Sequence, residues 1–134
     1  MDGDGMQTRP VIRALVAAHG ALAAGLVSAV DQITGRGTVF LALSNSCLSL
    51  SDIQETLSRA LDETGARVIF TDLPAGSCTM AVRKLMRERP DVTLITGANL
   101  ALLLDFAMQE HVDPVTAAHQ ALERGRASIV AHGA

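Results

Sequence analysis

The stretch that decides the fold reads VIRALVAAHG, residues 11–20, followed by ALAAGLVSAVDQIT, residues 21–34. Its first half is a short β-branched and apolar run, which predicts a strand over Val11–Ala17 that His19-Gly20 breaks. Its second half predicts a helix over Ala21–Thr34, ended by Gly35. The apolar residues that recur on one face of this helix are Leu22, Leu26, Val30 and Ile33.

The same alternation of strand and helix continues along the chain. Further strands are expected at Thr38–Leu43, Arg67–Thr71 and Val92–Thr96. Each is followed by a helix: from a Ser51/Gln54 capping box to about Thr64, from the Ser77 region to about Arg89, and from an Asn99 cap through Met108. Asp113-Pro114 begins a last helix to about Arg124. Four strands each followed by a helix predict an α/β fold, with an open four-stranded parallel sheet covered by helices on both faces.

Length and composition narrow the class of protein. The 134 residues suffice for one domain, expected at 10–134 after a disordered, acidic and Gly-rich leader at 1–9. Aromatic residues are 2% and the net charge is -3, which argues against nucleic-acid binding. The two cysteines and four histidines show no metal-ligand spacing, so neither a metal nor another cofactor is expected. Without a secretory signal or a membrane-length apolar run, the location expected is the cytoplasm.

Ligands of open parallel sheets bind outside the carboxyl ends of the strands, and that rule selects His19. The histidine stands where the first strand ends and the first helix begins. Asp72, at the end of the third strand, is well placed to hydrogen-bond one ring nitrogen and leave the other free as a nucleophile. Each residue alone has an ordinary explanation, since a lone histidine often fills a turn and an aspartate at a strand end often forms an Asx-turn.

A third feature is the short loop Ala75-Gly76-Ser77, immediately before a helix. Such a loop exposes free N–H groups at the positive end of a helix dipole, where an anion or phosphate binds, although a plain loop with a serine cap also fits. A nucleophilic histidine, an orienting aspartate and an anion cradle at one edge are what phosphoryl transfer through histidine requires. A hydrolase triad fits less well because Ala75–Thr79 lacks the second glycine of a nucleophile elbow. The chain has no P-loop, which argues against direct use of ATP.

At these residues the sequence resembles the IIA domains of the mannose-type bacterial sugar phosphotransferase system, from about Val11 to Val130. The three segments that carry the resemblance are Ala18-His19-Gly20 with the following Leu22–Leu26, Thr71–Ser77, and Ile95–Leu100. The resemblance implies that His19 carries a phosphoryl group, that Asp72 orients its ring, and that the loop at Ala75, Gly76 and Ser77 holds the phosphate oxygens. The implied enzyme class is a phosphotransferase with a phosphohistidine intermediate.

The resemblance also implies partners. The phosphoryl donor would be the histidine phosphocarrier protein, the acceptor a IIB domain, and the membrane IIC/IID complex an indirect partner. A homodimer that exchanges a C-terminal strand, here about Ala127–Ala131, is expected. Two alternatives remain open: a IIA-like phosphodonor for dihydroxyacetone kinase, and a regulatory phosphohistidine module.

The sequence departs from the family pattern at Ala75, where a second glycine is usual, and at Cys78-Thr79-Met80. A glycine at positive φ is not freely replaced by alanine, so a differently shaped loop is expected. Cys78 has two interpretations. It is either a small buried thiol that fills space, or a thiol whose pKa is lowered by the helix N-terminus and which is therefore easily oxidised or alkylated.

Overall fold

The computed structural model describes residues 11–134, so the leader expected at 1–9 lies outside the described residues. Its centre is a sheet of four parallel strands in the order β2-β1-β3-β4. The strands are β1 (Ala14–Ala18), β2 (Phe40–Ser44), β3 (Val68–Thr71) and β4 (Thr93–Ile95). The helices are α1 (Leu22–Thr34), α2 (Leu50–Thr64), α3 (Ser77–Leu85), α4 (Leu100–Met108) and α5 (Pro114–Ala127). The α/β fold with an all-parallel sheet is therefore confirmed.

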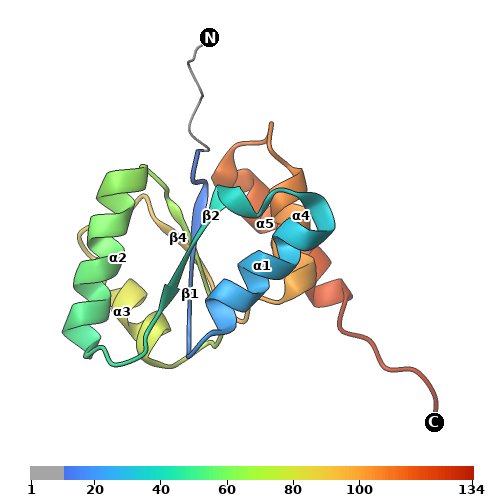
Figure 1. Cartoon of the computed structure of the whole chain (residues 1–134), viewed down its shortest axis with the longest axis horizontal. Coiled ribbons are helices and arrows are strands. Elements are labelled where there is room, and N and C mark those ends of the chain that lie inside the picture. Colours follow the sequence, from blue (N-terminus) through green and yellow to red (C-terminus); the bar gives the residue numbers. More distant parts are fainter. Residues whose placement is uncertain (1–10) are drawn as a thin grey trace.

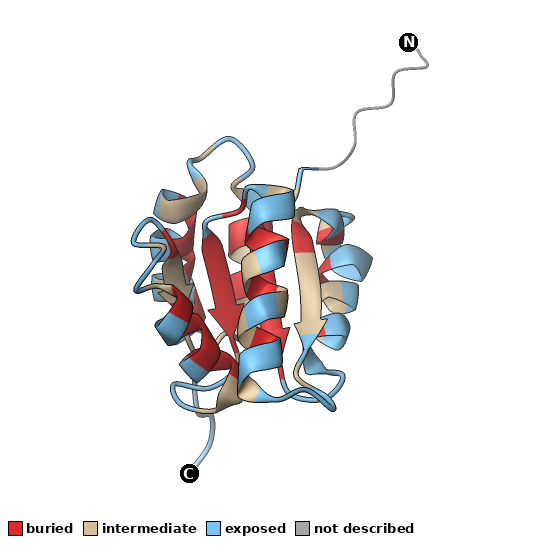
Figure 2. Cartoon of the chain, turned by 90° about the vertical axis from the view of Figure 1, so that its left-hand side faces the viewer, coloured by how far each residue is buried: buried red, intermediate tan, exposed pale blue. Residues whose placement is uncertain are grey.

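The helices cover the sheet from both sides (Figure 1). One face packs against α1, α4 and α5, and the other against α2 and α3. Alternation along β1 divides its side chains between two cores: Ala14, Val16 and Ala18 face the first, while Leu15 and Ala17 face the second. Both central strands, β1 and β3, are buried along their whole length, as their continuous apolar sequences predict (Figure 2).

The few aromatic residues gather in one place. Phe40, Phe70 and Phe106 come from β2, β3 and α4, and their ring centroids lie 5.1–6.3 Å apart in the first core. Since the sequence contains three phenylalanines and neither Trp nor Tyr, every aromatic side chain of the protein serves packing. Aliphatic side chains, many of them alanines, fill most of the rest of the interior.

Several predicted element boundaries are wrong. The first strand begins at Ala14 and not at Val11, and α3 ends at Leu85 and not near Arg89. The capping box of α2 is formed by Ser49 and Asp52, not by Ser51 and Gln54. The Ser49 hydroxyl accepts the Asp52 N–H, and the Asp52 carboxylate accepts the Ser49 N–H. The second strand begins two residues later than expected because Gly37–Val39 first forms a turn of 3₁₀ helix.

The end of the chain also differs from the prediction. The last helix is expected to end near Arg124, before Gly125, but α5 continues through this glycine to Ala127. A Cβ at Gly125 would stand 2.8 Å from Cβ of Leu102, so this glycine permits the close contact of α5 with α4. In the single described chain, residues 128–134 contain no strand, and Ile129 and Val130 are exposed on a tail that leaves the body (Figure 1). Exchange of this tail in a dimer stays a prediction.

Candidate functional site

The structure brings His19 and Asp72 together at the carboxyl end of the sheet. β1 and β3 are hydrogen-bonded neighbours, so the residues that follow them meet at one edge. Oδ2 of Asp72 accepts two hydrogen bonds from His19, one from the backbone N–H at 3.0 Å and one from ring Nδ1 at 2.9 Å. The ring is thereby held with Nδ1 protonated and Nε2 free. The His19 side chain is 44% exposed, whereas that of Asp72 is only 9% exposed.

The environment keeps Asp72 ionised. Burial by itself would raise the pKa of this carboxyl group. Hydrogen bonds from the backbone N–H and the ring of His19, and from the Asp72 backbone N–H, outweigh burial and hold the pKa below its ordinary value. At neutral pH the site therefore contains a carboxylate that stabilises positive charge on the histidine ring.

Gly76 places the loop of α3 against the other side of that ring. Its φ of 123° and ψ of 170° are accessible almost only to glycine. A Cβ at this position would lie 3.3 Å from Cε1 and 3.8 Å from Nε2 of His19. The free nitrogen of the ring thus lies beside the start of α3. Ala75 is exposed just before it and does not adopt positive φ, so the chain accommodates alanine there without backbone strain.

The helix ends at this site differ from the others. The side chains of Ser49, Asn99 and Asp113 cap α2, α4 and α5, respectively. By contrast, the residues at the N-cap positions of α1 and α3 are Ala21 and Gly76, and neither helix has a side-chain cap. The Leu22 N–H of α1 donates to the His19 carbonyl at 3.1 Å. The start of α3 lies beside Nε2, so its first-turn N–H groups and positive dipole end are available to a negatively charged group bound there.

Sequence reasoning missed Asn45. This residue follows β2, and its side chain accepts a hydrogen bond from the Gly20 N–H at 3.3 Å while donating one to the Ser77 hydroxyl at 2.9 Å. It therefore links the histidine turn to the predicted phosphate loop. The strand-end rule applies to the segment after β2 as well, but no sequence pattern distinguishes Asn45 from its neighbours Ser44 and Ser46.

The interpretation of Cys78 as a reactive thiol is wrong. The residue is 1% exposed and belongs to the core beneath α3. Burial raises the pKa of its thiol, the negative charge of Asp72 raises it further, and a hydrogen bond with Ser77 lowers it only in part. Burial and the charge of Asp72 outweigh that hydrogen bond, so the pKa of the thiol lies above its ordinary value and not below it, as the prediction required.

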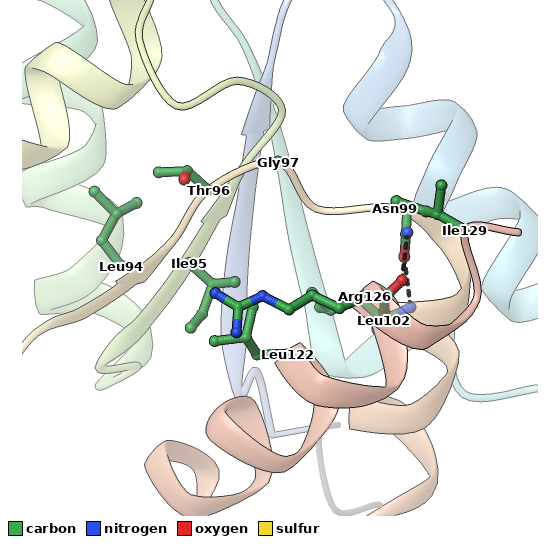
Figure 3. Close-up of a pocket in the computed structure, with 10 residues that line it drawn as sticks. Leu94, Ile95, Thr96, Gly97, Asn99, Leu102, Leu122, Arg126 and Ile129 are labelled. Atoms are coloured by element: carbon green, nitrogen blue, oxygen red, sulfur yellow. Dashed lines mark hydrogen bonds between the residues drawn. The ribbon is translucent and has the colours of Figure 1, made fainter.

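A separate cavity of about 280 Å³ opens between the end of β4 and the last turns of α5 (Figure 3). Ile95 and Leu122 line its apolar part, and the side chain of Arg126 lies along it. Asn99 closes one end by donating a hydrogen bond to the Gly125 carbonyl at 3.1 Å. The lining residues include none of the predicted site residues, so this cavity is distinct from the site at His19.

Comparison with known proteins identifies the family. The sequence profile described as "PTS system fructose IIA component" (EIIA-man) matches residues 13–122. The chain belongs to this IIA family of the phosphotransferase system. As an individual relative, the sorbose-specific EIIA component of Klebsiella pneumoniae is 28% identical to this IIA chain over 105 residues, which span 75% of the chain and 76% of that protein. The resemblance inferred from the sequence is therefore confirmed.

Solved structures share the IIA fold. The mannose/sorbose-specific IIA subunit of Enterococcus faecalis superposes with a TM-score of 0.76 at 17% identity, over 91% of this chain and 95% of that one. A sigma-54 interaction domain protein of Enterococcus faecalis gives a TM-score of 0.71 at 15% identity, over 90% and 94% of the two chains. At these identities the superpositions establish the fold alone.

Two further observations concern residues 11–134. None of the helices there is long and apolar enough to cross a membrane. The same residues contain no group of three or more histidine, cysteine, aspartate or glutamate side chains arranged to hold a metal ion.

Proposed function

We propose that this IIA chain is a phosphocarrier that accepts a phosphoryl group on Nε2 of His19 and passes it to a second protein. One observation carries the proposal: Asp72 holds Nδ1 of His19, so that Nε2 lies beside Gly76 and the uncapped start of α3. This arrangement combines a nucleophile, a charge-stabilising carboxylate and N–H donors for phosphate oxygens.

The transfer needs no group that the site lacks. The lone pair of Nε2 forms the new phosphorus–nitrogen bond, while the phosphorus–nitrogen bond of the donor's phosphohistidine breaks and leaves its electron pair on the donor nitrogen. A donor ring that begins protonated leaves as neutral imidazole. The ring of His19 retains its Nδ1 proton and becomes positively charged, and the Asp72 carboxylate stabilises that charge at 2.9 Å. The same steps in reverse release the group to the next protein.

The surface around His19 suits protein partners. Four apolar side chains, each 39–49% exposed, surround the site: Leu22, Leu48, Leu73 and Met80. Three of them are one hydrogen-bonded turn away from a site residue, and Leu73 directly follows Asp72. Such a rim excludes water when a partner docks. Family membership supports the histidine phosphocarrier protein as the donor, and as the acceptor a IIB domain that serves a membrane IIC/IID complex. The protein would then work in the cytoplasm.

The proposed homodimer has support in the exposed tail. β4 is an edge strand, and Ile129 and Val130 of the same chain are exposed near the cavity beside it. Adding the tail of one subunit to the free edge of the other's sheet would satisfy its unpaired backbone groups and bury these two side chains.

The experiment supplies phosphoenolpyruvate, the general phosphorylating enzymes of the system and the histidine phosphocarrier protein. Mass spectrometry at neutral pH should find one acid-labile phosphoryl group on the wild type and none on His19→Ala. His111→Ala is the matched control, because that histidine is exposed far along the chain after α4. A phosphorylated His19→Ala protein would refute the proposal. Adding purified IIB domain or dihydroxyacetone kinase subunits to the phosphorylated protein then identifies the acceptor.

The second candidate is a regulatory role, in which the phosphoryl group on His19 would serve as a signal. A regulatory module would take the phosphoryl group on His19 and fail to pass it to any IIB domain. Rapid loss of the group to a IIB domain would exclude that role as the main one.

A further inference from the structure

The loop between β2 and α2 holds the two halves of the site together. Ser44 Oγ donates to the Gly20 carbonyl at 2.7 Å, and the Asn45 N–H donates to the Ala18 carbonyl at 3.2 Å. The Asn45 side chain then reaches from the Gly20 N–H to the Ser77 hydroxyl. Ser77 is the first residue of α3, so a single amide joins the turn after β1 to the loop after β3.

The partners of this amide fix its orientation. A backbone N–H can only donate, so the atom of Asn45 that faces Gly20 must be the oxygen, and the NH₂ group must face Ser77. The NH₂ group has no acceptor capacity, and Ser77 Oγ is therefore the acceptor in this contact. The proton of the Ser77 hydroxyl is consequently not used toward Asn45.

We propose that Asn45 is a positioning residue for phosphoryl transfer, which makes the Ser77 hydroxyl a donor toward the phosphoryl oxygens. The inference rests on the proposed function. Ser77 is the first residue of α3 and directly follows Gly76, where a Cβ would lie 3.8 Å from Nε2 of His19. A hydroxyl that already accepts a hydrogen bond is a better donor in turn, because consecutive hydrogen bonds polarise one another. Asn45 thus directs the Ser77 hydroxyl proton toward the phosphoryl site without itself contacting the phosphoryl group.

The two substitutions of Asn45 separate this role from a structural one. Asn45→Ala removes both hydrogen bonds. Asn45→Asp keeps an acceptor for the Gly20 N–H. Its second carboxylate oxygen would accept a hydrogen bond from the Ser77 hydroxyl, which directs that proton away from the phosphoryl group, and the substitution adds a negative charge. A structural role predicts that Asn45→Asp is the milder change. The positioning role predicts the opposite order at neutral pH: phosphorylation slowed about tenfold in Asn45→Ala, as for the loss of one hydrogen bond to a charged group, and more in Asn45→Asp.

The experiment measures initial rates of His19 phosphorylation in a double-mutant cycle with Ser77→Ala. Once the hydroxyl is gone, Asn45→Ala should slow the reaction less than twofold further. Cys47→Ser, an exposed change in the same loop, should react like the wild type. Thermal unfolding of each variant verifies folding, and Asn45→Asp still decides the question if Asn45→Ala unfolds.

Two results would overturn the positioning role. One is that Asn45→Ala slows phosphorylation by the same factor whether residue 77 is serine or alanine. The other is that Asn45→Asp slows phosphorylation less than Asn45→Ala does. These outcomes require that the wild type is phosphorylated. A wild-type protein that takes no phosphoryl group would instead refute the proposed function itself, so the two failures are distinguishable.

Discussion

Replacing Gly76 by alanine tests how closely the backbone before α3 packs against the ring of His19. The φ of 123° and ψ of 170° at this position cost a residue with a Cβ about 1–3 kcal/mol. Alanine also restricts the unfolded chain, which returns about 0.4–1 kcal/mol. We therefore expect Gly76→Ala to lower the free energy of unfolding by about 1–2 kcal/mol.

The same substitution should also slow phosphoryl transfer. The added Cβ would lie 3.3 Å from Cε1 of His19, so the ring must move by a few tenths of an ångström away from the start of α3. Because a misplacement of about 1 Å costs roughly a hundredfold in rate, we expect about a tenfold slower phosphorylation.

Gly65→Ala is the matched control. Gly65 ends α2 at φ 74°, in the left-handed region, and a Cβ there would meet nothing within 4 Å. This glycine precedes β3 and so lies at the opposite edge of the sheet from His19. Gly65→Ala should lose about 0.5–1 kcal/mol of stability and keep the wild-type rate of transfer. Urea unfolding and phosphorylation by phosphoenolpyruvate measure the two effects. Equal transfer rates for Gly76→Ala and Gly65→Ala would refute the close fit.

Four further predictions concern the site and the tail. Asp72→Asn should transfer phosphate ~10²-fold more slowly or worse, because an amide cannot stabilise the charged ring. The pKa of Asp72 is lower in the folded protein than in the unfolded chain. The ionised carboxylate therefore stabilises the fold above about pH 4, and this stabilisation disappears as the pH falls through the folded-state pKa. The unfolding free energies of wild type and Asp72→Asn should converge in acid, and a difference that stays constant with pH would contradict this. Iodoacetamide should alkylate exposed Cys47 well before buried Cys78, and the reverse order would show that the thiol at α3 is accessible after all. Ending the chain at residue 128 spares α5 and should shift the light-scattering mass towards that of a monomer, whereas an unchanged dimer would place the interface elsewhere.

Most of the fold follows from local sequence pattern. The order and type of the elements are set by apolar runs, helical periodicity and Gly or Pro breaks, and these signals are strong in this chain. The misplaced cap of α2 shows their limit, since Ser49 and Ser51 are both good caps and only the path of the loop selects Ser49. Gly125 reads as a helix end in sequence, but contact with α4 explains it, and that contact is a tertiary feature.

The site was predictable where topology alone places residues. His19 and Asp72 follow adjacent strands of a parallel sheet, so their meeting depends only on strand order. Asn45 and Cys78 depend on finer matters. The bridge made by Asn45 needs a particular loop path after β2, and the raised pKa of Cys78 depends on which side of α3 faces the sheet. Neither is encoded in a short motif.

The most direct test of the account asks which nitrogen takes the phosphoryl group. Nitrogen-15 and phosphorus-31 NMR of the protein phosphorylated at neutral pH distinguishes the two ring positions of phosphohistidine. Because Asp72 occupies Nδ1 and the start of α3 lies beside Nε2, the account predicts a single phosphohistidine at residue 19, bonded through Nε2. Phosphorus on Nδ1 of His19, or on any other histidine of the chain, would contradict it.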